Sequence, residues 1–392
     1  MEKSRKPKIR FKGYNDDWEQ RKVGELVQFS KGNGYSKKDL EEVGTPIILY
    51  GRLYTNYETV ISDVDTYVCA KSGSVYSRGG EVIVPASGET SEDISIASVV
   101  EKPGFLLGGD LNIITPPIQL DSVFLAISIS NGKPHNDMAK MAQGKSVVHL
   151  HNSDLEKIDL LFPEHDEQIR ISSCIRGIDD LITLHQRKLE KLMNVKKSML
   201  EKMFPKQGST VPEIRFNGFT QAWEQRKLGE IASLITKGTT PVDKRNAGIV
   251  NFVKIESIDE SSGDITINQK ISVDEHNGYL RRSQLKENDI LFSIAGTLGR
   301  VTSVKSSILP ANTNQALAII RLKDGYLDYV KTYLKGKAVV DFIKKNPTIG
   351  AQPNLSLNQV SNLIIKTPSD LEQKEIGVFF EKIDNLITLH QR

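Results

Sequence analysis

Apolar residues in the middle of the chain recur every three or four positions over a long stretch. The recurring positions are Ile171, Ile175, Ile178, Ile182, His185, Leu189, Leu192, Lys196, Met199 and Met203, and eight of the ten are apolar. This spacing is typical of a coiled-coil seam. It predicts one helix from about Asp166 to Met203, roughly 55 Å long at 1.5 Å per residue. Pro205 ends the helix, and Lys206–Thr210 has the composition of a loop.

The last residues of the chain repeat the same seam. Its positions there are Ile376, Phe380, Ile383, Ile387 and His390. The sequence ends at Arg392, midway along the helix by comparison with the first copy. The second helix is therefore either shorter than the first or cut short.

Short apolar runs elsewhere, separated by Gly, Asn and Asp, predict strands. The runs are Thr45–Tyr50, Glu81–Pro85, Leu111–Thr115, Val250–Ile255, Asp289–Ile294 and Ala316–Leu322. An amphipathic pattern over Tyr326–Lys345 predicts a further helix. We therefore expect an α/β (α+β) protein with two similar domains, each built on a mixed β-sheet.

Two segments recur at one offset of 205 residues. Pro7–Leu26 matches Pro212–Ile231 at 12 of 20 positions, and Ile178–Arg187 matches Ile383–Arg392 at nine of ten. The sequence between these segments has diverged much further. One tandem duplication thus gives one frame with two different inserts.

A third match at this offset marks the start of each seam helix. Pro163 and Gln168, five residues apart, match Pro368 and Gln373. We expect a first domain over residues 1–165, a central helix over 166–206, a second domain over 207–370 and a second helix over 371–392.

The composition is that of a protein with sizeable cores. The 392 residues are 38% hydrophobic and 26% charged. No run approaches the ~18–20 apolar residues that span a bilayer, and the basic N-terminus lacks the apolar region of a signal peptide. Cys69 and Cys174 show no metal-ligand spacing, which favours reduced thiols in a cytosolic protein.

The net charge of +3 is divided unevenly along the chain. It is −4 over residues 1–165, +3 over 166–206 and +4 over 207–392. Neither half resembles a basic nucleic-acid tail. Any DNA binding therefore depends on local clusters of charge.

The sequence shows no motif for catalysis or metal binding. Gly144-Lys145-Ser146 resembles the end of a P-loop, but Ala139 stands where the upstream glycine is required. His135, His149 and His151 have no Cys or carboxylate partners at ligand spacing. We expect neither a catalytic residue nor a metal site.

The ordered set of motifs resembles the DNA specificity subunits of type I restriction–modification systems, over essentially the whole chain. The motifs that carry the resemblance are WEQRKxGE at 18–25 and 223–230, TKGTTP at 236–241, NDILFS at 288–293, GTLGR at 296–300, and the two Pro-x-x-x-x-Gln elements with their helices.

The resemblance implies two target recognition domains separated by two long antiparallel coiled-coil helices, related by a pseudo-two-fold. Each domain would read half of an asymmetric bipartite DNA target, and the helices would fix the unread spacer. The chain would have no catalysis and no bound cofactor of its own.

Its implied partners are double-stranded DNA, two methyltransferase (M) subunits and two restriction/translocase (R) subunits. The M subunits would use S-adenosylmethionine to methylate adenine N6, and the R subunits would use ATP and Mg. The complex would act in the cytoplasm of a bacterium or archaeon, in association with the nucleoid.

His185 and His390 occupy the same position of the repeat and interrupt the apolar seam. If the helices pack antiparallel about a pseudo-two-fold, the two side chains should meet at the crossing. The alternative is two partly exposed histidines that never meet. A polar seam residue can fix register at some cost in stability.

Candidate DNA contacts combine phosphate-binding cations with base-reading amides, hydroxyls or guanidiniums in loops. In the first domain they are Lys31, Asn33, Tyr35, Lys37, Arg52, Tyr54, Ser87, Thr90, Lys133, His135, Asn136 and Lys145. In the second domain they are Lys237, Thr239, Thr240, Lys244, Arg245, Arg281, Arg282, Thr297, Arg300, Asn312, Asn314, Gln315 and Gln352. Ser87–Thr90 aligns approximately with Ala295–Leu298.

Each candidate has a plainer interpretation as a surface residue without DNA contact, and Arg281-Arg282 is also explained as a solvated pair. The cations between Arg187 and Lys197 form either a solvated helix face or a contact with spacer phosphates or methyltransferase subunits. The competing functions are a coiled-coil adaptor with two binding lobes and a standalone methyltransferase or nuclease. The missing cofactor and catalytic motifs count against the second.

Overall fold

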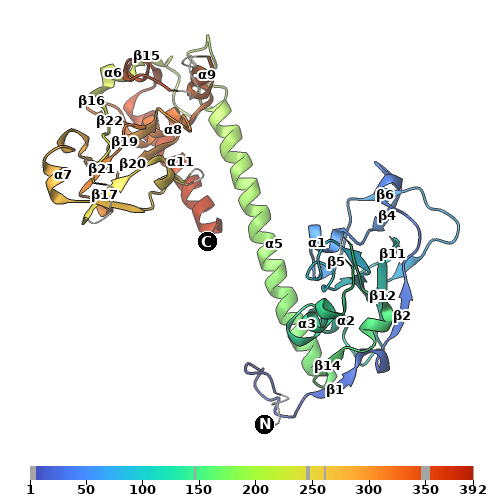
Figure 1. Ribbon diagram of the computed structural model, residues 1–392. Coiled ribbons are helices and arrows are strands. Elements are labelled where there is room, and N and C mark those ends of the chain that lie inside the picture. The colour runs from blue at the N-terminus through green and yellow to red at the C-terminus, as the bar shows by residue number, and fades with distance from the viewer. Residues whose placement is uncertain (1–5, 145–146, 244–247, 260–261, 346–353, 392) are drawn as a thin grey trace. The chain divides into compact units, whose positions relative to one another are not determined.

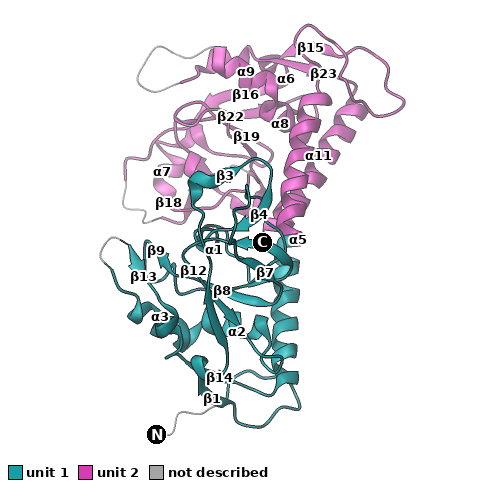
Figure 2. Cartoon of the chain, turned by 90° about the vertical axis from the view of Figure 1, so that its right-hand side faces the viewer, with its two compact units in different colours: residues 1–183 teal, residues 184–392 magenta. Residues whose placement is uncertain are grey.

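The chain folds into two compact units. The computed structural model describes residues 6–144, 147–243, 248–259, 262–345 and 354–391. Residues 1–183 form unit 1 and residues 184–392 form unit 2 (Figure 2). The boundary lies inside one continuous helix, α5 (His165–Lys202), drawn unbroken in Figure 1. The helix predicted from Asp166 to Met203 is therefore confirmed.

Unit 1 contains two five-stranded sheets and two short two-stranded ribbons. The sheets have the strand orders β2–β12–β8–β10–β5 and β3–β6–β4–β11–β7, and the ribbons are β1–β14 and β13–β9. The strands are β1 (Glu19–Lys22), β2 (Gln28–Lys31), β3 (Leu40–Glu41), β4 (Thr45–Ile48), β5 (Val60–Ile61), β6 (Tyr67–Val68), β7 (Tyr76–Arg78), β8 (Glu81–Pro85), β9 (Ser87–Gly88), β10 (Ser98–Val100), β11 (Pro103–Leu107), β12 (Leu111–Thr115), β13 (Val148–His149) and β14 (Asp159–Phe162). All three strands predicted here are present.

Unit 2 contains a four-stranded sheet, a three-stranded sheet and one ribbon. Their strand orders are β16–β22–β19–β20, β18–β17–β21 and β15–β23. The strands are β15 (Glu224–Lys227), β16 (Ala232–Lys237), β17 (Val250–Val253), β18 (Gln269–Ile271), β19 (Ile290–Ser293), β20 (Val301–Ser303), β21 (Ala311–Thr313), β22 (Leu317–Leu322) and β23 (Ile364–Thr367). The three strands predicted for this half are confirmed as β17, β19 and β22.

The two units share one topology. In each, one sheet places β12 or β22 between two antiparallel neighbours, β2 and β8 or β16 and β19. In each, the second sheet contains one parallel pair, β4–β11 or β17–β21. The loop after β2 or β16 is held by an equivalent backbone hydrogen bond in each unit. Asn33 N donates to Leu107 O at 3.1 Å, and Thr239 N donates to Thr313 O at 2.9 Å. The fold therefore confirms the tandem duplication and the mixed sheets.

A pair of helices follows the sheet in each unit. The pairs are α2 (Ser122–Ile129) with α3 (Gly132–Met141), and α8 (Leu327–Lys335) with α9 (Lys337–Lys345). The single helix predicted over Tyr326–Lys345 is wrong, because the chain breaks at Gly336. Glycine is a weak helix former, and its extended backbone (ψ 165°) redirects the chain here.

The described residues also form five shorter α-helices and several 3-10 turns. The five helices are α1 (Arg52–Thr55), α4 (Asn152–Leu155), α6 (Leu228–Ile231), α7 (Val273–Asn277) and α10 (Leu357–Ser361). No helix among the described residues is both long and apolar enough to cross a membrane.

A ribbon of two strands joins the beginning and the end of each unit. Glu19–Lys22 pairs with Asp159–Phe162, and Glu224–Lys227 pairs with Ile364–Thr367 in the same register, shifted by 205 residues. The WEQRK segment found twice in the sequence thus has one structural role in both units: it brings the opening segment to the start of the seam helix.

An arginine from the opening segment clamps the start of that helix in each unit. Arg10 donates from Nε and Nη2 to the two carboxylate oxygens of Glu167, at 2.7 Å each, and Arg215 binds Glu372 with the same two distances. Both glutamate side chains are only 1% exposed. Bidentate arginine–carboxylate bonds are strong and directional, so each pair holds the start of the helix against the opening segment.

The glutamine of each Pro-x-x-x-x-Gln element makes a second tie beside the clamp. Gln168 Nε2 donates to Pro163 O at 2.9 Å, and its Oε1 accepts from Asp121 N at 2.9 Å. Gln373 makes the equivalent two bonds at 3.0 Å each, to groups 205 residues further along. The buried amide therefore links the helix start to the α2 or α8 N-terminus.

Within unit 2, the end of α5 packs antiparallel against α11 (Asp370–Gln391). Phe204, just beyond α5, lies 5.9 Å from Phe380 between ring centroids, and Lys196 Nζ lies 2.6 Å from Asp384 Oδ1. In these contacts, the later residue of α5 or its end contacts the earlier residue of α11, so the two helices run antiparallel. The interpretation of Lys196 as part of a solvated face is wrong, because its side chain is 16% exposed and paired.

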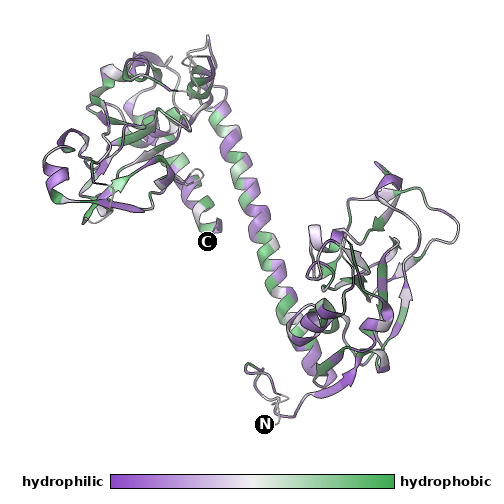
Figure 3. Ribbon diagram, in the orientation of Figure 1, coloured by the Kyte–Doolittle hydropathy of each residue, from purple (hydrophilic) through white to green (hydrophobic). Residues whose placement is uncertain are grey.

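The seam is buried along α11 but open along the first half of α5. Ile383 and Ile387 are 7% and 2% exposed, whereas Ile178 and Ile182 are 48% and 51% exposed. Figure 3 shows apolar and polar residues alternating along α5. The predicted seam packing is therefore confirmed in unit 2, where Leu189 is half-buried; Ile175 of unit 1 is also half-buried.

We predict that Arg215→Met destabilises unit 2 by about 3 kcal/mol, because it leaves the buried Glu372 carboxylate without its partner. Adding Glu372→Met should recover most of that loss, since the charge is then removed with its partner. Chemical denaturation measures both effects. Arg21→Met is the matched control: its pair with Glu25 is exposed on both sides, and such pairs contribute about 0–1 kcal/mol. Equal losses in the single and double variants would contradict the clamp.

Candidate nucleic-acid interface

In unit 2, the TKGTTP loop packs against the turn after β21. Gly238 lies so close to this turn that a Cβ there would stand 2.1 Å from Thr313 O and 2.2 Å from Asn314 O. Only glycine allows this approach. It brings Thr240 beside Gln315, and the Thr240 hydroxyl is hydrogen-bonded to the Gln315 amide oxygen. Four predicted contacts, Thr239, Thr240, Asn314 and Gln315, therefore lie together.

A groove of about 520 Å³ opens beside these four residues. Thr240 and Asn314 line it together with Lys254, Glu256 and Gln269, which the sequence analysis missed. The signal available in the sequence was slight: Lys254 lies near the end of a predicted strand, and Gln269 lies in a polar segment without a recognisable motif.

The Arg300 guanidinium points into the domain and holds two loops together. Its Nη1 donates to Ile255 O at 3.3 Å and to Ile258 O at 3.1 Å. Its backbone N–H donates to Ser293 Oγ at 2.7 Å, and that hydroxyl donates to Thr297 O at 2.6 Å. Arg300 therefore shapes the GTLGR loop, on which the Thr297 side chain is exposed.

Asn312 was predicted to read a base, and its placement contradicts this. Its side chain is fully buried. Its Nδ2 donates to Leu280 O at 2.8 Å and to Ser283 Oγ at 3.1 Å, and its Oδ1 accepts from His276 Nδ1 at 2.5 Å. The amide is used entirely inside the domain, because β21 lies within the three-stranded sheet.

Among the other candidates of unit 2, Lys237, Arg281 and Arg282 are exposed. The two arginines stand in a short turn, away from the groove lining. This agrees with their interpretation as a solvated pair. Lys244, Arg245 and Gln352 lie outside the described residues.

In unit 1, Asn33 and Tyr35 hold one loop against another. Asn33 Nδ2 donates to Gly73 O at 3.1 Å, and the Tyr35 hydroxyl accepts from Lys71 N at 2.6 Å. Lys71 Nζ also lies 4.9 Å from the centre of the Tyr35 ring. Of the predicted cluster, Lys31 and Lys37 remain exposed at the surface of this loop pair.

Two predicted cations of unit 1 are neutralised inside the unit. Arg52 Nη2 donates to Glu58 at 2.5 Å, and Lys133 Nζ donates to Asp159 at 2.9 Å. The bond to Asp159 raises the pKa of Lys133. Lys133 lies on α3, with His135 and Asn136, and not in the polar loop that was predicted. Lys145 lies outside the described residues.

The remaining candidates of unit 1 surround the ribbon β9–β13. Ser87 is buried within β9, which contradicts its predicted contact. Thr90 Oγ1 accepts from Asp93 N at 3.1 Å, and His135 Nδ1 donates to Ser95 O at 2.7 Å. Tyr54 is half-buried, and burial raises the pKa of its hydroxyl.

The predicted equivalence of Ser87–Thr90 with Ala295–Leu298 is confirmed by pairing. Ser87 pairs with His149, and Ala295 pairs with Asn354, which stands 205 residues after that histidine. Within the described residues, no three His, Cys, Asp or Glu side chains gather as a metal site. Cys69 and Cys174 are both free and exposed.

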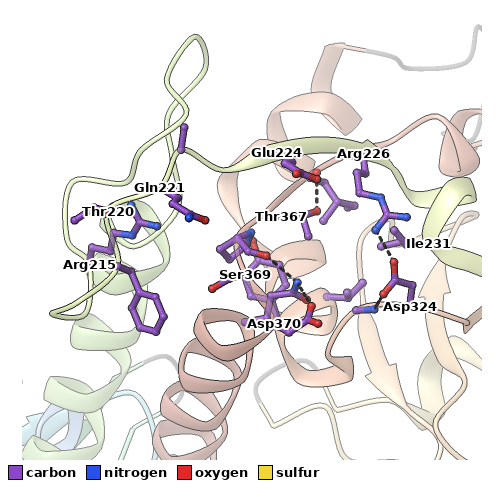
Figure 4. A pocket seen from close by; sticks show the side chains of 18 of the residues that line it. Arg215, Thr220, Gln221, Glu224, Arg226, Ile231, Asp324, Thr367, Ser369 and Asp370 are labelled. Carbon is purple, nitrogen blue, oxygen red and sulfur yellow. Dashed lines mark hydrogen bonds and ion pairs between the residues drawn. The ribbon is translucent and has the colours of Figure 1, made fainter.

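A pocket of about 580 Å³ lies at the base of unit 2, between the opening segment, β15, β23 and the start of α11 (Figure 4). Arg226 donates to Asp324 across it at 2.5 Å, which raises the pKa of the arginine. The clamp arginine Arg215 and the buried glutamine Gln373 are part of its wall. Most of the pocket wall thus comes from the duplicated frame, and Asp324, Gly325, Tyr329 and Val330 add a side from the insert.

The two seam histidines meet, as one of the two sequence hypotheses expected. Nδ1 of His185 lies 2.9 Å from Nδ1 of His390, and the ring centroids are 5.0 Å apart. One nitrogen must donate and the other accept, so only one of these nitrogens carries the shared proton. Desolvation lowers the pKa of His390, and the charges of Lys188 and His185 lower it further.

Comparison with known proteins places this architecture in a family. Residues 15–194 and 220–392 each match the type I restriction modification DNA specificity domain. These matches span most of the chain, and the chain belongs to this family. The prediction of a specificity subunit, with a role in DNA sequence recognition and no catalysis of its own, is confirmed.

Two specificity subunits and one solved structure illustrate the likeness. The chain is 21% identical over 390 residues to the type I restriction enzyme MjaVIII specificity subunit of Methanocaldococcus jannaschii, covering 96% of this chain and 88% of that protein. It is 28% identical over 131 residues to the EcoBI specificity subunit of Escherichia coli, covering 32% and 27%. The S subunit of a type I system from M. genitalium has the same fold, with a TM-score of 0.58, 14% identity and coverage of 98% and 94%.

We predict that the double variant His185→Leu/His390→Leu raises the melting temperature, because two polar seam residues become apolar. A depressed histidine pKa means that the wild-type pair gives its full stability above about pH 6.5 and loses it as the pH falls below that value. The double variant should lack this loss, while His149→Leu, at an exposed site, should retain it.

The same double variant should loosen the helix register. Spin labels at Lys191 and Lys382, both exposed, would then give a broader distance distribution. Marked thermal destabilisation of the double variant, or an unchanged pH profile, would contradict this account of the histidine pair.

Proposed function

We propose that the chain reads the two halves of one asymmetric bipartite DNA target, one with each unit. The observation that carries this proposal is the contrast between frame and insert. The clamps Arg10–Glu167 and Arg215–Glu372 have the same geometry. At the candidate interface, Lys254, Glu256 and Asn314 of unit 2 stand where unit 1 has Leu49, Gly51 and Gly108. The same frame thus carries two units with different side chains at the candidate DNA interface.

The chain directs adenine-N6 methylation and restriction that partner subunits carry out. Two M subunits use S-adenosylmethionine, and two R subunits use ATP and Mg; the chain itself binds none of these cofactors. The site of action is the cytoplasm, beside the DNA of a bacterial or archaeal nucleoid. The similarity to the specificity subunit of a type I restriction enzyme, MjaVIII, supports this assignment of partners.

Exposed leucines at equivalent positions of the two seam helices favour partners that are present in pairs. Leu181 and Leu184 are 57% and 60% exposed, and their repeat equivalents Leu386 and Leu389 are 42% and 66% exposed. These leucines lie off the seam and are identical in the two copies. Exposed apolar residues of this kind mark interaction sites, and a site that occurs twice suits one M subunit at each copy.

The predicted outcome in cells is N6-methyladenine at a single asymmetric bipartite motif. It should appear when this chain is expressed together with its partner methyltransferase, and disappear when the chain is removed. Methylome sequencing of both strains measures it. A coiled-coil adaptor without a DNA role would leave the two methylomes identical, and that result would overturn the proposal.

A further inference from the structure

The groove in unit 2 contains an amide with an unused hydrogen-bonding atom. Gln269 is half-buried at the start of β18, where it is the register partner of Phe252 on β17. Its Oε1 is buried and has no hydrogen-bond partner in the described structure. A buried carbonyl oxygen left unpaired is unfavourable in the free protein. An N–H group of a ligand would satisfy this oxygen once the half-buried amide turns toward the groove that Gln269 lines.

The side chains around Gln269 are polar and chemically varied. Thr240, Asn268 and Asn314 supply donors and acceptors, Lys254 supplies a positive charge, and the exposed Glu256 supplies only acceptors. The fully buried Phe252 ring forms part of the lining. The volume of about 520 Å³ admits the edge of a base.

Unit 1 has the same backbone at this place but a different side chain. Phe252 of β17 corresponds to Ile47 of β4, because each strand pairs with one parallel and one antiparallel neighbour in the same order. Opposite Ile47 stands Thr66, whose hydroxyl donates to Ile47 O at 2.7 Å. The position equivalent to Gln269 is therefore satisfied internally in unit 1.

The other groove residues also differ between the units. Counting along matched strands, Lys254, Glu256 and Asn314 correspond to Leu49, Gly51 and Gly108. The polar set is confined to unit 2. Since the scaffold does not require these side chains, they suit a task that only unit 2 performs.

We propose that Gln269 reads an adenine of the half-site bound by unit 2, through the major-groove edge of the base. A glutamine amide accepts from adenine N6 and donates to N7 at once. Lys254 binds an adjacent phosphate. This assignment rests on the proposed function and names the residue that supplies part of its specificity.

The test compares methylomes directed by the wild-type chain and by Gln269→Met, in the complete complex with its methyltransferase. Methionine retains the length of the side chain and removes both hydrogen-bonding groups. We expect one A·T position in one half of the motif to become degenerate, with roughly tenfold or greater loss of discrimination there. The other half should be unchanged. Thermal melting shows whether the variant remains folded.

Thr66→Val is the matched control at the equivalent place in unit 1, and it should leave that A·T position specific. A motif unchanged by Gln269→Met overturns the inference, as does a uniform loss of methylation from a folded variant without a degenerate position. A wild-type chain that directs no bipartite motif at all overturns the proposed function, and this inference with it. The two failures are thus distinguishable.

Discussion

The architecture depends on one buried ion pair made twice. Glu167 and Glu372 are buried at the start of the seam helices. Without its arginine, each buried carboxylate would destabilise the fold. The arginine belongs to the opening segment of the same unit, so the chain must return that segment to the helix before either is stable. The ribbon of the WEQRK segment and the buried glutamine amide complete this closure. These few bonds hold the start of each seam helix against the opening segment.

A frame fixed in this way leaves the insert free to change. The parallel pair and the loop contacts are common to both units, yet Lys254, Glu256 and Asn314 in the groove of unit 2 are replaced by Leu49, Gly51 and Gly108 in unit 1. Main-chain hydrogen bonds hold the loops in both units. In unit 2 the backbone at Gly238 lies so close to Thr313 that no side chain fits between them. Because the backbone supplies the shape, the exposed side chains can differ without cost to the fold.

The frame could be predicted from the sequence because its signals are local or repeated. The seam period predicted α5 almost to the residue. The shared offset led to two hypotheses for His185 and His390, and the structure confirms the one in which they meet. The candidate interface was harder to predict, since polar residue type does not reveal which way a side chain points. Asn312 is a plausible reader in sequence, but its strand carries it into the core, and Arg300 turns inward to bridge two loops. Gln269 has no local signature at all; only its register partner and its unpaired oxygen distinguish it.

The most direct test of the central claim exchanges an insert while keeping the frame. Residues 28–158 would be replaced by a second copy of residues 233–363, which leaves both clamps and both seam helices in place. The account predicts that the methylated motif changes in one half only, and that the new half carries the specificity already read by unit 2. A motif that changes in both halves, or one that does not change in either, would contradict the division between a constant frame and two independent readers.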